Sequence, residues 1–374
     1  MKKFEKLIST AVQSEVSDIH IAGGHATVLR HHGRIRKDED ETWTHEEVDR
    51  LVGGLLDDNQ LRMLRSRQSL DFAATVHSTR LRINVFNSMR GLSIAVRLLP
   101  GTAPSFEDLN LHPSLEKICE LRSGLVLICG ATGTGKTTTI AALVERINQT
   151  RTDHIITLED PIEFRFQSKC AFVEQRELGT HVISFEQGLL DALREDPDVI
   201  VVGELRERAT MRLTLNAAEA GNLVIATLHA TNPEDAVYRL CNAFPLEAQE
   251  EVRSQLASTL QWLIVQNLVF QEKLGYRLPV LSILRNTQPV KGIIRDNKLF
   301  QLESTIQMGK ADGMFTRERY IKDFLNTREQ FTPPSRAFQP SEEVTREKLY
   351  RSPLMAGGGN PGEAPATDSP EERS

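Results

Sequence analysis

The sequence predicts an α/β protein with two domains, and three observations carry that prediction. Segments within residues 71–98 alternate apolar and polar residues with period two, which is typical of antiparallel strands with one solvated face. From about Leu115, short apolar runs alternate with helical patterns, as in a parallel sheet with crossover helices. Pro100–Ser105 fits neither period and indicates a linker. The expected parts are an N-terminal α+β domain over 1–99, a linker over 100–112, a core domain over 113–330 and a disordered tail over 331–374.

Local patterns define the N-terminal elements. Residues 1–12 place four apolar side chains on one face among charged residues, which predicts an amphipathic helix and not the continuous apolar core of a signal peptide. Thr44 with Glu47 three residues later forms a capping box that begins a second helix. The expected strands cover residues 18–21, 26–30, 71–76, 80–86 and 92–98.

The core domain is expected to have four strands, at 125–129, 155–158, 199–202 and 224–227. A leucine-rich stretch from Glu247 to about Leu268 predicts a helix. After residue 330 the chain is rich in proline and glycine. Such a segment cannot bury enough apolar surface to offset its ordering entropy, so the tail is predicted to be disordered.

Composition limits the possible functions. The 45 basic and 51 acidic residues give a formal net charge of −6, which argues against a broad nucleic-acid surface. The densest basic stretch, Arg30–Lys37, has no Phe, Tyr or Trp for base stacking and predicts a solvated hairpin. The four cysteines form no C-x-x-C pair, which argues against zinc and disulfides. No apolar run approaches the roughly 18 residues of a membrane helix. We therefore expect a cytoplasmic protein without direct membrane insertion.

A phosphate-binding loop lies at the start of the core. Residues 130–137 read GATGTGKT and fit G-x-x-x-x-G-K-[ST], between an apolar strand and a helical pattern. Glycines let backbone N–H groups converge on phosphate oxygens, and the helix N-terminus adds positive potential. Lys136 is expected at the β- and γ-phosphates of ATP, and the Thr137 hydroxyl on Mg²⁺. The expected nucleotide-binding residues are Gly130, Ala131, Thr132, Gly133, Thr134, Gly135, Lys136, Thr137 and Thr138.

Two acidic segments follow predicted strands. Glu159–Glu163 contains three carboxylates, and Glu204 follows the apolar run at 199–202. Ligands of α/β sheets bind at the carboxyl ends of the strands, so these groups are expected near the phosphates. Glu204 is suited to deprotonate the attacking water, with Glu163 positioning water or metal; Glu159 and Glu204 are the expected carboxylates for Mg²⁺. The simpler alternative is an exposed carboxylate at each strand end.

Thr227-Leu228-His229 ends another apolar run. An imidazole there is suited to sense the γ-phosphate, although a lone histidine is more often a hydrogen-bonded structural residue. The order of these motifs resembles the type II/IV secretion ATPase superfamily, and within it the type IV pilus retraction ATPases (PilT/PilU-like), over residues 1 to about 330. The segments similar to family motifs are Ser17–His20, Arg80–Phe86, Glu159–Glu163, Gly203–Arg206 and Thr227–His229.

The resemblance implies a hexameric ring with an N-terminal PAS-like domain and a RecA-like P-loop ATPase core, with the nucleotide between the two domains. By position, Arg82 and Arg97 are the arginines that would approach the phosphates from the neighbouring position. The simpler alternative is that they line a solvated strand face. The resemblance also implies an inner-membrane pilus platform protein as partner, which would hold the ring at the inner face of the cytoplasmic membrane.

Some positions depart from the family pattern. Asn222 stands where the family commonly has a histidine, and the segments Ile264–Asn267 and Pro289–Asp296 lack arginines of the corresponding family segments. The leading hypothesis is a motor that couples ATP hydrolysis to pilus retraction and twitching motility. The alternative is an accessory PilU-like paralogue, or a non-motor modulator, that assembles with another pilus ATPase. A DNA translocase is disfavoured by the net charge and by the lack of stacking aromatics.

Overall fold

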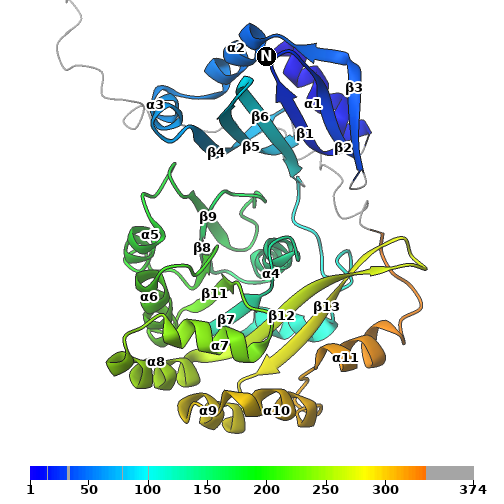
Figure 1. The fold of residues 1–374 in the computed structure, drawn as a ribbon. Helices are drawn as coiled ribbons and strands as arrows, with labels where there is room; N and C mark the ends of the chain where they lie inside the picture. The colour runs from blue at the N-terminus through cyan, green and yellow to red at the C-terminus, as the bar shows by residue number, and fades with distance from the viewer. Residues whose placement is uncertain (15, 32–33, 78, 100, 334–374) are drawn as a thin grey trace, which may run out of the picture.

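The computed structural model describes residues 1–14, 16–31, 34–77, 79–99 and 101–333, arranged around two sheets that follow one another along the chain (Figure 1). The first sheet, with its helices, comprises α1 (Lys2–Gln13), β1 (Val16–Ala22), β2 (His25–His31), β3 (Arg34–Trp43), α2 (His45–Leu55), α3 (Asp58–Arg67), β4 (Ser69–Val76), β5 (Thr79–Ser88) and β6 (Gly91–Leu99).

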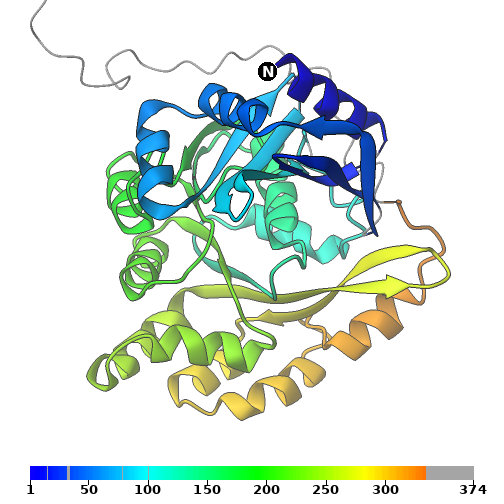
Figure 2. The same cartoon turned by 45° about the horizontal axis from the view of Figure 1, so that its top comes forward.

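The N-terminal sheet has the strand order β3-β2-β1-β6-β5-β4, and all its neighbours are antiparallel, as predicted for β4 to β6. Alternation along β5 explains its two faces. Leu81, Ile83 and Val85 are fully buried in the core under the helices, whereas Arg80 and Arg82 belong to the opposite face. That face looks toward the second sheet (Figure 2). The capping box of Thr44 and Glu47 at α2 and the charged β2–β3 pairing are confirmed.

The second sheet carries the rest of the described chain. Its elements are η1 (Pro113–Glu120), β7 (Gly124–Cys129), α4 (Lys136–Thr150), β8 (His154–Glu159), β9 (Phe172–Glu177), α5 (Phe185–Ala192), β10 (Val199–Val202), α6 (Arg208–Glu219), β11 (Leu223–Leu228), α7 (Pro233–Asn242), α8 (Leu246–Thr259), β12 (Leu260–Gln271), β13 (Tyr276–Arg285), α9 (Gln288–Arg295), η2 (Leu299–Gln301), α10 (Leu302–Met308), α11 (Arg317–Tyr320) and η3 (Ile321–Leu325).

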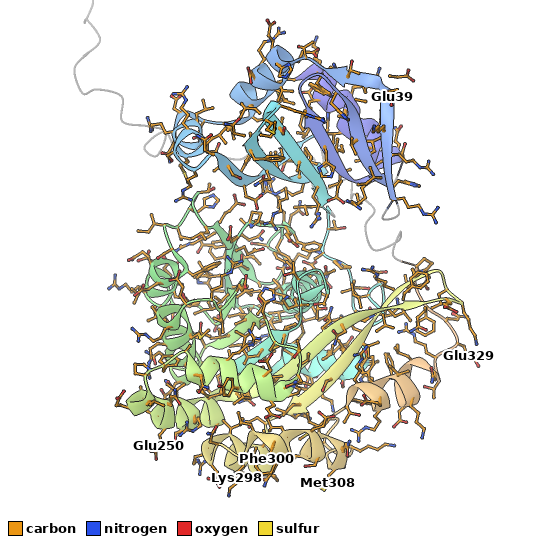
Figure 3. All side chains as sticks on the ribbon, in the orientation of Figure 1. Glu39, Glu250, Lys298, Phe300, Met308 and Glu329 are labelled. Atoms are coloured by element: carbon orange, nitrogen blue, oxygen red, sulfur yellow. The ribbon has the colours of Figure 1, made fainter. Side chains whose placement is uncertain are left out.

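This sheet has the order β13-β12-β7-β11-β10-β8-β9, and all neighbours are parallel except the β12–β13 pair. Two apolar clusters cover its faces, one including residues of α4 and η1 and the other residues of α5 to α9. Burial on both faces explains why strands such as β7 and β11 read as continuous apolar runs. Helices α9 and α10 lie at the end far from the N-terminal sheet, where Phe300 and Met308 are exposed (Figure 3).

One predicted element is wrong in part. The expected helix from Glu247 to about Leu268 ends at Thr259, and β12 begins at Leu260. Seven of the ten residues from 260 to 269 are apolar, and periodicity alone does not separate a buried helix from a buried strand. The segment forms a strand because it pairs with β7 on one side and with β13 on the other. Strands β9 and β13 had no counterpart among the expected elements.

The segment between the two sheets is joined to the end of the described chain. Buried Asn110 donates its amide to the Thr332 carbonyl and accepts from the Thr332 N–H, at 2.9 Å each. Phe331 packs against the core beside these bonds. Residues 331–333 therefore belong to the folded part, which corrects the expected start of the tail at 331. The rest of the expected tail, 334–374, lies outside the described residues. Over the described chain, no helix has the length and apolar character needed to cross a bilayer.

Candidate functional site

The phosphate loop connects β7 to α4, and its backbone requires glycine at one position above all. Gly130 has φ +147°, and a Cβ there would lie 2.4 Å from the Gln266 carbonyl oxygen and 2.7 Å from Thr134 Oγ1. Gly133 and Gly135 also have positive φ values, of +77° and +85°. The loop thus keeps its backbone N–H groups at the start of α4, the arrangement that binds phosphate.

Lys136 closes this loop. Its Nζ donates to the carbonyl oxygens of Gly130 and Ala131, both at 2.9 Å. Burial lowers the pKa of Lys136, and the negative charge of Glu204 opposes that shift. The ammonium thus lies over the loop, with a carboxylate close enough to act on it. Backbone amides and an ammonium group suit a triphosphate, and the adjacent Thr137 hydroxyl is an oxygen ligand of the kind that Mg²⁺ takes.

Gln266 on β12 holds the phosphate loop through hydrogen bonds. It was not identified from the sequence as a site residue. Its Nε2 donates to the Thr134 carbonyl at 2.7 Å, and its Oε1 accepts from Thr139 Oγ1 at 2.8 Å. The side chain is 2 % exposed. The sequence offered only a polar residue among apolar neighbours, because its place beside the loop depends on β12 pairing with β7.

Sheet order brings the other predicted groups to the same edge. Strands β7, β11, β10 and β8 are neighbours, so their carboxyl ends lie in a row. His229 Nε2, beyond β11, lies 2.9 Å from Glu204 Oε1, beyond β10. The other Glu204 oxygen accepts from Arg206 at 2.6 Å, and the Thr227 hydroxyl donates to the Gly203 carbonyl. Glu204 and His229 are therefore brought together, on the edge of the sheet that also carries the phosphate loop and Lys136.

Glu159 is the last residue of β8, and its hydrogen bonds are made to residues other than Glu204 and His229. Its Oε1 accepts from Thr157 Oγ1 at 2.6 Å and from Gln175 Nε2 at 3.0 Å. Burial raises the pKa of Glu159 to about 7. Burial likewise raises the pKa of Glu163, and the positive charges of Arg82 and Arg97 oppose that shift. The acidic segment 159–163 thus lies beneath the arginine-bearing face of the N-terminal sheet.

The two predicted arginines are held within their own sheet. Arg82 and Arg97 are direct cross-strand partners on β5 and β6. Arg82 Nη2 donates to Asp71 Oδ2 at 2.6 Å, and Arg97 Nε donates to Asp18 Oδ1 at 2.8 Å. Both side chains remain at least a third exposed, and their charges act on Glu163.

The predicted metal ligands do not form a ready-made protein cage. Among the described residues, no group of three or more His, Cys, Asp or Glu side chains could hold a metal ion. Glu159 is turned toward Thr157 and Gln175, and Glu204 toward His229 and Arg206. A loop that offers Thr137 beside bound phosphates fits the usual Mg²⁺ site, in which the metal keeps several waters and takes few protein ligands.

Comparison with known proteins decides the family. The model of the type II/IV secretion system protein family matches residues 1–297. The chain belongs to this family. It is 41 % identical over 313 residues to the uncharacterized protein YggR of Escherichia coli, covering 83 % of this chain and 95 % of that protein. It is 40 % identical over 299 residues to a twitching motility protein of Neisseria gonorrhoeae, covering 80 % of each.

A solved structure agrees with this assignment. The crystal structure of the pilus retraction motor PilT with bound ADP superposes with a TM-score of 0.80 at 35 % identity. The match covers 91 % of this chain and 97 % of that one. Both sheets of the present fold therefore have counterparts in a nucleotide-binding relative.

Proposed function

We propose that this chain is a hexameric ATPase motor that retracts type IV pili and so supports twitching motility. The observation that carries the proposal is the Glu204–His229 pair, 2.9 Å apart, at the sheet edge that also holds the phosphate loop and Lys136. The names of the similar proteins, a twitching motility protein and a pilus retraction motor, supply the cellular task.

In the proposed reaction each residue has one role. The loop amides and Lys136 bind the β- and γ-phosphates of ATP, so the ammonium exchanges its two loop carbonyls for phosphate oxygens. Glu204 accepts a proton from the attacking water, and His229 holds the carboxylate in place. Thr137 would hold Mg²⁺, which would neutralise phosphate charge.

The acidic segment and the N-terminal arginines complete the proposed site. Glu163 orients the water, while Arg82 and Arg97 stabilise the charge that develops on the phosphoryl group. These arginines then exchange Asp71 and Asp18 for phosphate oxygens, which requires the N-terminal sheet to approach the loop. Closure of the sheets is therefore the proposed link between hydrolysis and mechanical work.

The N-terminal domain is taken as PAS-like and the core as RecA-like, with an inner-membrane platform protein as the partner at the cytoplasmic face of the membrane. A PilU-like accessory role is the second candidate, favoured by the departures at Asn222 and Asn267. Asn222, however, lies at the amino end of β11, where its amide bonds to the Pro197 carbonyl, away from the phosphate loop.

Two experiments test the proposal. Purified wild-type chain should hydrolyse ATP by itself, and absence of turnover would favour the modulator over the motor. A strain without the chain should carry excess surface pili and lose twitching. Loss of pili instead would mean that the motor assembles pili, and normal twitching with normal pili would reject a role in retraction.

A further inference from the structure

Arg80 connects the N-terminal sheet directly to the acidic segment. It lies on β5, two residues before Arg82 and on the same face, but it is only 8 % exposed. Its Nε donates to the Ile162 carbonyl at 3.2 Å, and its Nη2 donates to Glu177 Oε2 at 3.1 Å. Arg80 thus pairs across the two sheets, whereas Arg82 pairs within its own.

Glu177 bonds to the N–H of Ile162, the residue whose carbonyl accepts from Arg80. It ends β9 and is 6 % exposed, and its Oε2 also accepts from the Ile162 N–H at 3.0 Å. Its Oε1 accepts from Thr180 Oγ1 at 3.2 Å. The ion pair therefore satisfies both the N–H and the carbonyl of Ile162. The next residue along the chain is Glu163.

Because the Arg80–Glu177 ion pair is buried, its two side chains must stay close together. Removing one partner of a buried ion pair leaves an uncompensated charge, so such pairs tolerate little displacement. The adjoining strand end is fixed as well, because the Leu178 N–H donates to the Glu159 carbonyl at 2.9 Å. Segment 159–163 is thereby held between β9 and the N-terminal sheet.

We propose that Arg80 is a positioning residue. Together with Glu177 it holds the backbone of Ile162, so that the location of Glu163 depends on where the N-terminal sheet lies. The proposal rests on the proposed ATPase function and deepens it. Movement of the N-terminal sheet away from the core pulls on the acidic segment through Arg80. The site is then complete only when the sheet is seated, independently of nucleotide binding at the phosphate loop.

The test compares Arg80→Gln with the control Arg176→Gln. Arg176 is the neighbour of Glu177 on β9 and forms a 2.7 Å ion pair with Glu195 that reaches neither Ile162 nor the N-terminal sheet. Three quantities are measured in each full-length variant: kcat for ATP, the Kd for ADP, and hydrogen–deuterium exchange of peptides that cover 158–166 and 125–140. Arg80→Gln/Glu177→Gln, which leaves no buried unpaired charge, serves in place of the single variant if that variant does not fold.

The expected result is a fall in kcat of at least tenfold with the ADP Kd within threefold, and faster exchange confined to 158–166. Arg80→Lys, which keeps the ion pair, should recover part of kcat, and Arg176→Gln should match the wild type. A kcat within twofold of wild type overturns the proposal, as does a fall in kcat without faster exchange at 158–166. If the wild type hydrolyses no ATP, the proposed function fails, and the exchange data alone then decide whether Arg80 holds the segment.

Discussion

His229 Nε2 and Glu204 Oε1, which leave two neighbouring parallel strands, lie 2.9 Å apart at the carboxyl edge of the central sheet. The imidazole leaves Glu204 one oxygen for Arg206 and fixes the plane of the carboxylate. Such a fixed carboxylate is what a base for water requires, because the proton must be accepted along one direction.

The first prediction concerns this pair. Glu204→Gln should lower kcat for ATP by roughly 10²–10⁴-fold, the usual contribution of a general base, with ADP affinity nearly unchanged. His229→Gln should have a smaller effect, because the histidine positions the base and accepts no proton from water. Steady-state turnover and ADP titration measure both. His154→Gln is the control, since His154 lies 3.0 Å from Glu174 in a pair at the opposite end of β8. Wild-type turnover in Glu204→Gln would remove the base assignment.

The second prediction concerns Arg82. Arg82→Ala should reduce kcat far more than ADP affinity, because the arginine acts on developing charge. Arg82 lies on the same face of β5 as Arg80, which bonds to the Ile162 carbonyl of the same chain at 3.2 Å. We therefore expect each subunit to use its own arginine, in place of one from the neighbouring position. Mixed rings of Arg82→Ala and Lys136→Ala subunits should therefore regain no activity. Recovery of turnover in verified mixed rings would show that the arginine serves a neighbouring subunit.

The third prediction separates two glycines of the phosphate loop. Both have positive φ, so an alanine at either is expected to lower the free energy of unfolding by about 1–2 kcal/mol. Gly130→Ala should be worse than Gly133→Ala, since its methyl would also meet the Gln266 carbonyl at 2.4 Å whereas position 133 has no atom within 4 Å. Chemical denaturation without nucleotide measures the difference. Equal losses would mean that Gln266 does not confine the loop.

The fourth prediction is a pH dependence set by Glu159, whose pKa burial raises from 4.5 to about 7. Below pH 4.5 the group is protonated in both the folded and unfolded states and has no effect. Between pH 4.5 and 7 the carboxyl is ionised in the unfolded chain but still protonated in the folded one. The free energy of unfolding therefore falls across this window, by up to about 3 kcal/mol, and changes no further above pH 7. Glu159→Gln should therefore gain stability over wild type between pH 5 and 8. A difference in unfolding free energy that does not change with pH would contradict the assignment.

The fifth prediction tests the end of the folded chain. Deleting 331–374 removes Thr332 and leaves the buried Asn110 amide without its partner, which should lower the free energy of unfolding by about 1–3 kcal/mol. Deleting 334–374 breaks no described contact and should leave stability unchanged. Thermal unfolding of the two truncations makes the comparison. Identical melting temperatures would show that the Asn110–Thr332 bonds do not contribute.

The sequence predicted those features that depend on local pattern. The phosphate loop, the antiparallel strands β4 to β6 and the parallel direction of β7, β8, β10 and β11 follow from spacing and periodicity, and all are present; the strand order was not predicted. Strand β12 was mistaken for helix because its pairing with β7 and β13 is set by tertiary structure. The residue roles at the site stay predictions.

Long-range polar contacts were the part that the sequence did not reveal. Arg80 and Glu177 are 97 residues apart, and neither stands out from its neighbours by type. Gln266 and Thr134 are 132 residues apart and become partners only when β12 lies beside β7. Pattern reasoning finds which groups a strand end presents, but it does not show which distant side chain holds them.

The pair of hydrogen bonds between Asn110 and Thr332 determines how the end of the described chain moves. Asn110 follows the first sheet in the chain, but its neighbours Phe106 and Leu111 pack in the core of the second sheet. The end of the described chain is thus fastened to that core, close in sequence to the junction with the first sheet. If the two sheets turned relative to one another, Thr332 would therefore travel with the second sheet.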